Sequence, residues 1–124
     1  MAISEEKMAI LTGAGIDMES NNERFMGNVA LMDRFFGKFL NDPNYKKLSD
    51  AIAEGNKEDA FAAAHTLKGV CGNLSLKALE KIVAEQTEML RGGDMEAAAA
   101  VMPKVKEEYE RLKEAFGKVL PLGE

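Results

Sequence analysis

Apolar residues recur at three- and four-residue steps along most of the chain, which is the spacing of one face of an α-helix. Over residues 29–40 the apolar stripe consists of Val29, Met32, Phe35, Phe36, Phe39 and Leu40. Over the last segment it consists of Ala98, Met102, Val105, Tyr109, Leu112, Phe116 and Val119. No stretch alternates with a period of two over the length of a strand. The pattern therefore predicts an all-α protein.

Capping residues and glycines divide this pattern into helices. The predicted N-caps are Asp17, Asn28, Asp42 with Pro43 in the first turn, Asn56 and Asp94. The predicted helices cover 4–11, a short stretch after 17, and then 29–40, 42–55, 56–74, 76–90 and 95–119. Pro103 should bend the last of them near its first turns. Four substantial helices with short connections predict an antiparallel up-down-up-down four-helix bundle, with the short additional N-terminal helices covering one end.

The two central helices carry the clearest apolar seams. In the first, the seam is Ala60, Ala64, Leu67, Cys71 and Leu74. In the second, it is Leu76, Leu79, Val83, Gln86 and Leu90. Gln86 is the one polar member, and we expect it near the rim with its amide in water.

Composition narrows the function classes. A chain of 124 residues is sized for a single domain, 1–124. The formal net charge of −5 provides no field that attracts nucleic acid or an anionic membrane. One cysteine and one histidine leave no credible metal-ligand set. No apolar run approaches the roughly 18 residues of a membrane span, and we expect a cytoplasmic, monomeric protein without cofactor or metal.

His65 is the only histidine, and it directly follows Ala64, a seam position. Because successive helical residues are about 100° apart, its ring should point to solvent at the edge of the bundle. The residues three, four and seven positions further on share its face, and they are Lys68, Gly69 and Gly72. A single histidine on a helix usually has no catalytic or binding role, so a functional role for His65 depends on these neighbours.

Each neighbour has a physical consequence. Glycine inside a helix costs about 1 kcal/mol relative to alanine, and Gly69 would leave open space beside the ring in return. Gly72 would extend that bare strip, and Lys68 would place an ammonium where it can pair with phosphate. The plainer alternatives are close helix packing or early helix termination for the glycines, and a solvated surface charge for Lys68.

Other chemistries fit the same helix poorly. Cys71 lies on a different face from His65, which excludes a local Cys–His pair. The positions three and four residues to either side of His65 hold no Asp or Glu that could orient the ring. The chain also has no glycine-rich phosphate loop. If it handles phosphate, another protein must supply it, and we expect no autonomous catalysis.

The stretch "AHTLKGVCGNLSLKAL" resembles the signature of the histidine-containing phosphotransfer (HPt) domain of two-component phosphorelays. The matching residues are His65, Leu67, Lys68 and Gly69, followed by Asn73 and Leu74. The segment "GIDMESNNERFMGNVALMDRFFGKF" is similar to the opening helices of such domains, so the resemblance covers most of residues 15–117. One departure is Ser75, where HPt patterns usually have glycine; we expect it to cap the next helix.

The resemblance implies roles for these residues. His65 would be the phosphoacceptor, exchanging a phosphoryl group with the aspartates of response-regulator receiver domains. Lys68 would stabilise the phosphoryl group, and Gly69 would provide clearance. Magnesium would be bound by the receiver, and a hybrid sensor histidine kinase would stand upstream.

We expect the docking patch around His65 to take in Phe61, Gly72, and exposed positions of the following helix such as Lys77 and Thr87. Two other functions stay open at this point, a non-phosphorylated module that sequesters a receiver and a plain helical scaffold. The initial Met and the "LPLGE" end lead us to expect a free-standing protein rather than a domain cut from a hybrid kinase.

Overall fold

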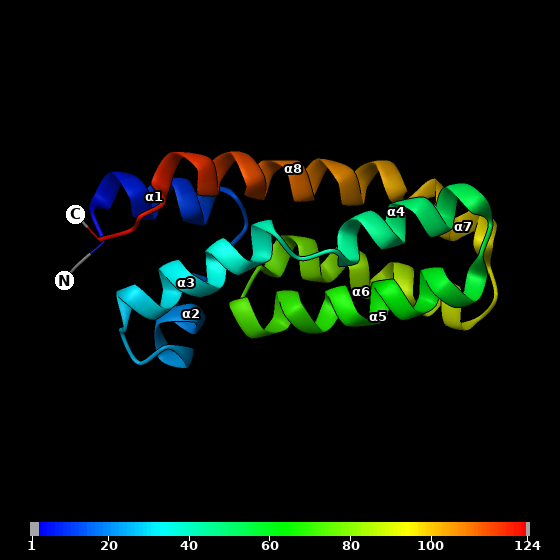
Figure 1. The fold of residues 1–124 in the computed structure, drawn as a ribbon, viewed down its shortest axis with the longest axis horizontal. Helices are drawn as coiled ribbons and strands as arrows, with labels where there is room; N and C mark the ends of the chain where they lie inside the picture. Colours follow the sequence, from blue (N-terminus) through cyan, green and yellow to red (C-terminus); the bar gives the residue numbers. More distant parts are fainter. Residues whose placement is uncertain (1–2, 124) are drawn as a thin grey trace.

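Helices account for most of residues 3–123, the part of the chain that the computed structural model describes (Figure 1). In chain order they are α1 (Glu5–Gly13), α2 (Met18–Arg24), α3 (Val29–Leu40), α4 (Asn44–Glu54), α5 (Lys57–Leu74), α6 (Lys77–Arg91), α7 (Met95–Ala100) and α8 (Met102–Val119). Within these residues the only β-type pairing is an isolated bridge between Ile3 and Gly123. The predicted all-α class is confirmed.

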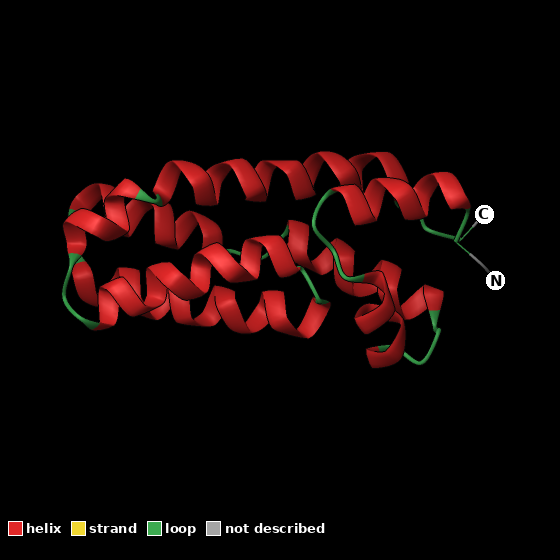
Figure 2. Cartoon of the chain, turned by 180° about the vertical axis from the view of Figure 1, so that it is seen from behind, coloured by secondary structure: helices red, strands yellow, loops and turns green. Residues whose placement is uncertain are grey.

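The four columns of the bundle are α3 with α4, α5, α6, and α7 with α8. The chain reverses direction between successive columns, which gives the predicted up-down-up-down order (Figure 1). Helix α1 lies along the C-terminal half of α8, and both ends of the chain meet at that end of the molecule (Figure 2). The N-terminal helices therefore cover one end of the bundle, as expected.

Four of the five predicted N-caps form. The side chains of Asp17, Asn28, Asn56 and Asp94 each accept a hydrogen bond from the backbone N–H three residues on, and Ser4, which was not predicted, does the same at the start of α1. The start of α4 differs from the prediction. Asp42 Oδ1 accepts from the backbone N–H of Asn44 at 2.9 Å, and Pro43 takes the N-cap position, so the helix begins at residue 44.

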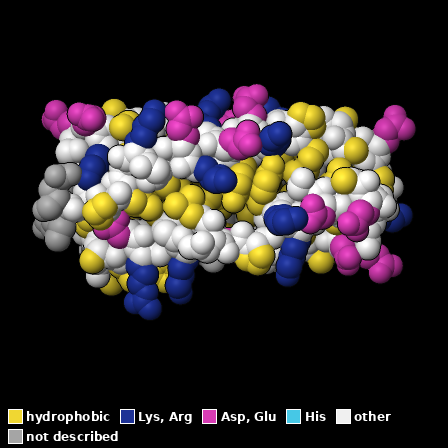
Figure 3. Space-filling model, turned by 45° about the horizontal axis from the view of Figure 1, so that its top comes forward, with side chains coloured by type: hydrophobic (Ala, Val, Ile, Leu, Met, Phe, Trp, Pro, Cys, Tyr) yellow, Lys and Arg dark blue, Asp and Glu magenta, His cyan; other side chains and the backbone are white. Residues whose placement is uncertain are grey.

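Aromatic side chains join α8 to the α3–α4 column. The rings of Phe36 and Phe116 stack with centroids 4.7 Å apart, and those of Tyr45 and Tyr109 stack at 3.8 Å. Figure 3 shows a band of apolar side chains along this seam, flanked by charged ones. Because aromatic rings bury more area than any other side chain, this seam holds the long C-terminal helix in place.

Gln86 lies inside the protein, and the prediction that its amide reaches water is wrong. Its side chain is fully buried, and its Nε2 donates to the backbone oxygen of Ala98 at 3.0 Å. Gln86 is buried because of a break in the facing column, where Pro103 lacks an N–H and the helix is interrupted at Val101 between α7 and α8. The bend expected near Pro103 is therefore a break, and the buried amide of Gln86 donates to a backbone oxygen next to it.

Ser75 ends α5 and does not cap α6 as expected. Its φ of 60° is left-handed, a conformation that favours glycine, and Leu76 occupies the N-cap position without a side-chain bond. Two contacts hold it there. Its backbone oxygen accepts from the N–H of Asp17 at 2.9 Å, and its hydroxyl lies 3.0 Å from that of Ser20. These contacts offset the strain that a glycine would avoid.

Residues 15–21, here called the N-terminal brace, pack against this α5–α6 turn. Asn21 Nδ2 donates to the backbone oxygen of Leu74 at 3.1 Å, and the N–H of Ala78 donates to the oxygen of Gly15 at 3.1 Å. Gly15 has a φ of 86°, and a Cβ added there would overlap the Cβ of Ala78. The brace therefore requires glycine at position 15 in order to approach α6.

A pair of glycine variants tests the brace. Gly15→Ala should lower the free energy of unfolding by about 1–2 kcal/mol or more, because it adds both left-handed strain and an overlap. Gly13→Ala is the matched control, because a Cβ there meets nothing within 4 Å and alanine favours the end of α1. Urea unfolding should show the first variant destabilised and the second unchanged or slightly stabilised. Equal stabilities for the two variants would contradict the close approach.

Candidate functional site

The burial of one face of α5 places His65 on the opposite face. The buried side chains of the helix are those of Ala60, Ala63, Ala64, Leu67, Cys71 and Leu74. His65 is exposed, and so is Thr66, whose hydroxyl donates to the backbone oxygen of Ala62 at 3.0 Å. The imidazole therefore lies in solvent, as the sequence predicts, on a helix whose other face is buried from Ala60 to Leu74.

The His65 ring rests on an aromatic neighbour. The rings of Phe61 and His65 are stacked, with centroids 5.8 Å apart and planes 12° from parallel. The guanidinium of Arg91, from the end of α6, lies 5.1 Å from the centroid of the Phe61 ring. Sequence analysis placed Phe61 near the site but missed Arg91. The four-residue spacing of Phe61 and His65 was a usable signal, whereas nothing in the local sequence brings Arg91 to the site.

Lys68 and Gly69 lie on the helical turn that follows His65. A Cβ added at Gly69 would meet nothing within 4 Å, so the space over this residue is open. Lys68 is half-buried, and within residues 3–123 no carboxylate forms an ion pair with it. One turn of the helix thus presents an open surface and a cation that is not already neutralised.

Gly72 differs from the expectation of a bare strip. A Cβ added there would lie 3.1 Å from Oε2 of Glu80, so a carboxylate of α6 already covers this position. Glu80 also pairs with Lys77, whose Nζ lies 3.5 Å from Oε1. Lys77 is exposed at the start of α6. The open strip therefore runs from His65 over Gly69 and ends at a charged pair.

Thr87 does not belong to the exposed surface, and its predicted place in the docking patch is wrong. The side chain is fully buried, and its hydroxyl donates to the backbone oxygen of Val83 at 2.7 Å. A hydroxyl that bonds its own helix backbone can be buried at little cost, which a hydropathy pattern does not reveal. The exposed neighbour in the sequence is Glu88, which pairs with Arg91 at 3.2 Å.

The thiol of Cys71 offers no competing nucleophile. It is fully buried, and desolvation, with smaller contributions from the charges of Glu80 and Asp42, raises its pKa far above the usual range. Among the side chains of residues 3–123, no group of three or more His, Cys, Asp or Glu is placed to hold a metal ion. None of the helices described is long and apolar enough to cross a membrane.

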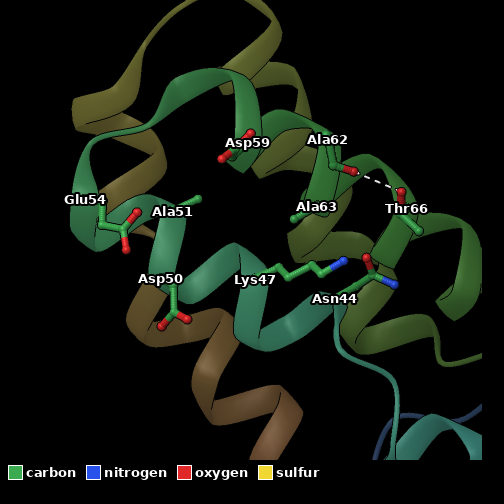
Figure 4. A pocket seen from close by; sticks show the side chains of 9 residues that line it. All are labelled: Asn44, Lys47, Asp50, Ala51, Glu54, Asp59, Ala62, Ala63 and Thr66. Carbon is green, nitrogen blue, oxygen red and sulfur yellow. Dashed lines mark hydrogen bonds between the residues drawn. The ribbon is translucent and has the colours of Figure 1, made fainter.

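A hollow of about 500 Å³ lies between α4 and α5, on one side of the histidine face. Its lining residues are Asn44, Lys47, Asp50, Ala51, Glu54, Asp59, Ala62, Ala63 and Thr66 (Figure 4). Lys47 extends toward Asn44 and Thr66, while the carboxylates gather at the other end (Figure 4). His65 does not line this hollow. The candidate site is therefore an open helix face, which another protein can cover, and not a cavity that encloses a small substrate.

Comparison with known proteins identifies the family. The model of the Hpt domain matches residues 41–115, which include α4 to α7, most of α8, and His65 with its neighbours. Neither the curated proteins nor the solved structures contain a match to the chain. Hpt domains are phosphocarriers of two-component phosphorelays, where they interact with receiver domains and kinases. Because the match takes in more than half of the chain, this protein belongs to the Hpt domain family and to two-component phosphorelay signalling.

Proposed function

We propose that this protein carries a phosphoryl group between receiver-domain aspartates on His65. The observation that carries the proposal is the exposed imidazole, followed one turn later by an open Gly69 and by Lys68, which forms no ion pair within residues 3–123. An open face suits a donor that is itself a protein, because the active site of the receiver has to close over the ring. A small-molecule kinase reaction would need a nucleotide pocket instead.

The proposed phosphoryl transfer needs no nucleotide or water, because each bond that forms is matched by one that breaks. A lone pair on one ring nitrogen of His65 attacks the phosphorus of an aspartyl phosphate on the receiver. A P–N bond forms, the P–O bond breaks, and its electron pair leaves with the aspartate as a carboxylate. In the onward step the carboxylate of a second receiver attacks the same phosphorus, and the imidazole leaves with the P–N electron pair. The protein is thus a carrier, without catalytic activity of its own.

The residues around the ring have separate tasks in this proposal. The Lys68 ammonium pairs with the phosphoryl oxygens and stabilises the negative charge that they carry. Gly69 leaves the approach path open, and Phe61, Gly72 and Lys77 border the docking surface. The receiver supplies the magnesium ion, and a hybrid sensor kinase supplies the phosphate. The protein would act as a monomer in the cytoplasm.

Label transfer separates this function from its alternatives. A cognate receiver carrying a labelled aspartyl phosphate should pass the label to the wild-type protein, and His65→Gln should receive none. A protein that binds the receiver but takes no label would be a sequestering module. A protein that neither binds nor takes label from any cognate receiver would be a helical scaffold. Either of these two outcomes would refute the carrier role.

Substitutions at Gly69 test the clearance. Gly69→Leu should slow transfer at least about tenfold, because bulk beside the ring blocks the approach of the receiver, while the free energy of unfolding stays the same or rises. Gly69→Ala controls for glycine flexibility, since its methyl group meets nothing in the structure. It should stabilise the protein by about 0.5–1 kcal/mol and slow transfer much less. Normal transfer by Gly69→Leu would disprove the clearance role.

Two lysine variants test whether the Lys68 ammonium stabilises the phosphoryl group. Lys68→Ala should slow transfer by about tenfold and leave the helical circular dichroism spectrum unchanged, because the lost interaction is with the phosphoryl group. Lys81→Ala is the matched control, since it removes an exposed lysine from the side of α6 that adjoins α8. The control should transfer at the wild-type rate. Equal slowing by both variants would point to net charge and against a specific contact.

A further inference from the structure

We infer that Phe61 is a positioning residue, which holds the His65 ring in the orientation that transfer requires. The inference rests on the proposed function and adds a second element to it. In that proposal Lys68 and Gly69 act on the phosphoryl group and on the approach of the receiver. Neither of them fixes the direction in which the imidazole points.

The ring has few other restraints. Within residues 3–123 neither ring nitrogen of His65 forms a hydrogen bond, and no carboxylate orients the imidazole from α5 or from a neighbouring helix. An exposed side chain without partners exchanges between rotamers in picoseconds to nanoseconds. The near-parallel stack on Phe61, with centroids 5.8 Å apart, is therefore the contact that limits this motion.

The geometry of the helix favours the contact. Side chains of an α-helix lean toward its N-terminus, so His65 leans over the preceding turn, where Phe61 stands four residues earlier. A centroid separation of 5.8 Å with planes 12° apart is an offset stack, within the range that aromatic pairs prefer. The imidazole thus lies nearly parallel to the phenyl ring and displaced from it, and its two nitrogens lie at the edge of the imidazole, where a phosphoryl group must approach.

Phe61 is itself held from the neighbouring helix. Its side chain is half-buried, and the Arg91 guanidinium lies 5.1 Å from its ring centroid, within cation–π range. Glu88 pairs with Arg91 at 3.2 Å and restrains the guanidinium in turn. The orientation of an exposed imidazole on α5 is thus coupled to side chains at the end of α6. A ring ordered in advance loses less freedom when the receiver docks.

Kinetics separate positioning from docking. A residue that only touches the receiver changes the receiver concentration at half-maximal transfer. A residue that orients the imidazole changes the maximal rate at saturating receiver. Phe61→Leu keeps an apolar side chain but removes the stack, and Phe61→Tyr restores an aromatic ring.

The experiment measures transfer from a phosphorylated receiver, together with the NMR signals of the single histidine. Phe61→Leu should lower the maximal rate about threefold to tenfold and shift the His65 ring-proton signals, because the ring current of the neighbouring phenyl group is lost. Phe61→Tyr should restore both. Phe35→Leu is the matched control, a half-buried phenylalanine on α3 whose own partners are Phe25 and Lys38, and it should change neither readout.

The outcomes distinguish this inference from the function on which it rests. A wild-type protein that takes no label refutes the proposed function, and the positioning role with it. If the wild type transfers and Phe61→Leu keeps the maximal rate, the positioning role alone is refuted, even where the half-saturating concentration rises. Unchanged His65 signals in Phe61→Leu would likewise refute the stack as a restraint in solution.

Discussion

Everything at the candidate site depends on the burial of one face of α5. Ala60, Ala64, Leu67 and Cys71 are almost completely withdrawn from water, and their packing leaves the helix no freedom to rotate about its axis. Rotation by one position, about 100°, would move His65 toward the core and carry Leu67 out of it. The hydrophobic effect on one side of the helix thus determines which chemistry is exposed on the other.

The small side chains of α5 have a role on both its buried and its exposed face. Alanines on the buried face allow the neighbouring helices to approach closely, and Gly69 on the exposed face keeps the surface open beside the ring. Neighbouring segments add contacts that α5 does not make by itself. The N-terminal brace secures the turn after α5, while Arg91 of α6 reaches back to Phe61. A site on an open helix face therefore draws its rigidity from contacts well outside the matching motif.

The sequence was most informative where local pattern decides the outcome. The seam through Ala64 and Leu67 follows from helical periodicity, and so does the exposure of His65. The sequence was least informative where contacts that a hydropathy pattern does not show decide whether a residue is buried. Gln86 is buried because the facing column breaks near Pro103, and Thr87 is buried because its hydroxyl bonds the backbone of its own helix. Glu80 covers Gly72 from another helix, which no pattern within α5 can reveal.

The central claim is that a phosphoryl group is carried on the imidazole of His65, and NMR tests it most directly. Because the chain has one histidine, its ring signals can be assigned without ambiguity. After incubation with a phosphorylated receiver, the account predicts a phosphorus resonance coupled to the imidazole and shifted His65 ring signals, both lost in His65→Gln. A receiver that loses its phosphate while the His65 signals stay unchanged, or a phosphoryl group found on another residue, would contradict the account.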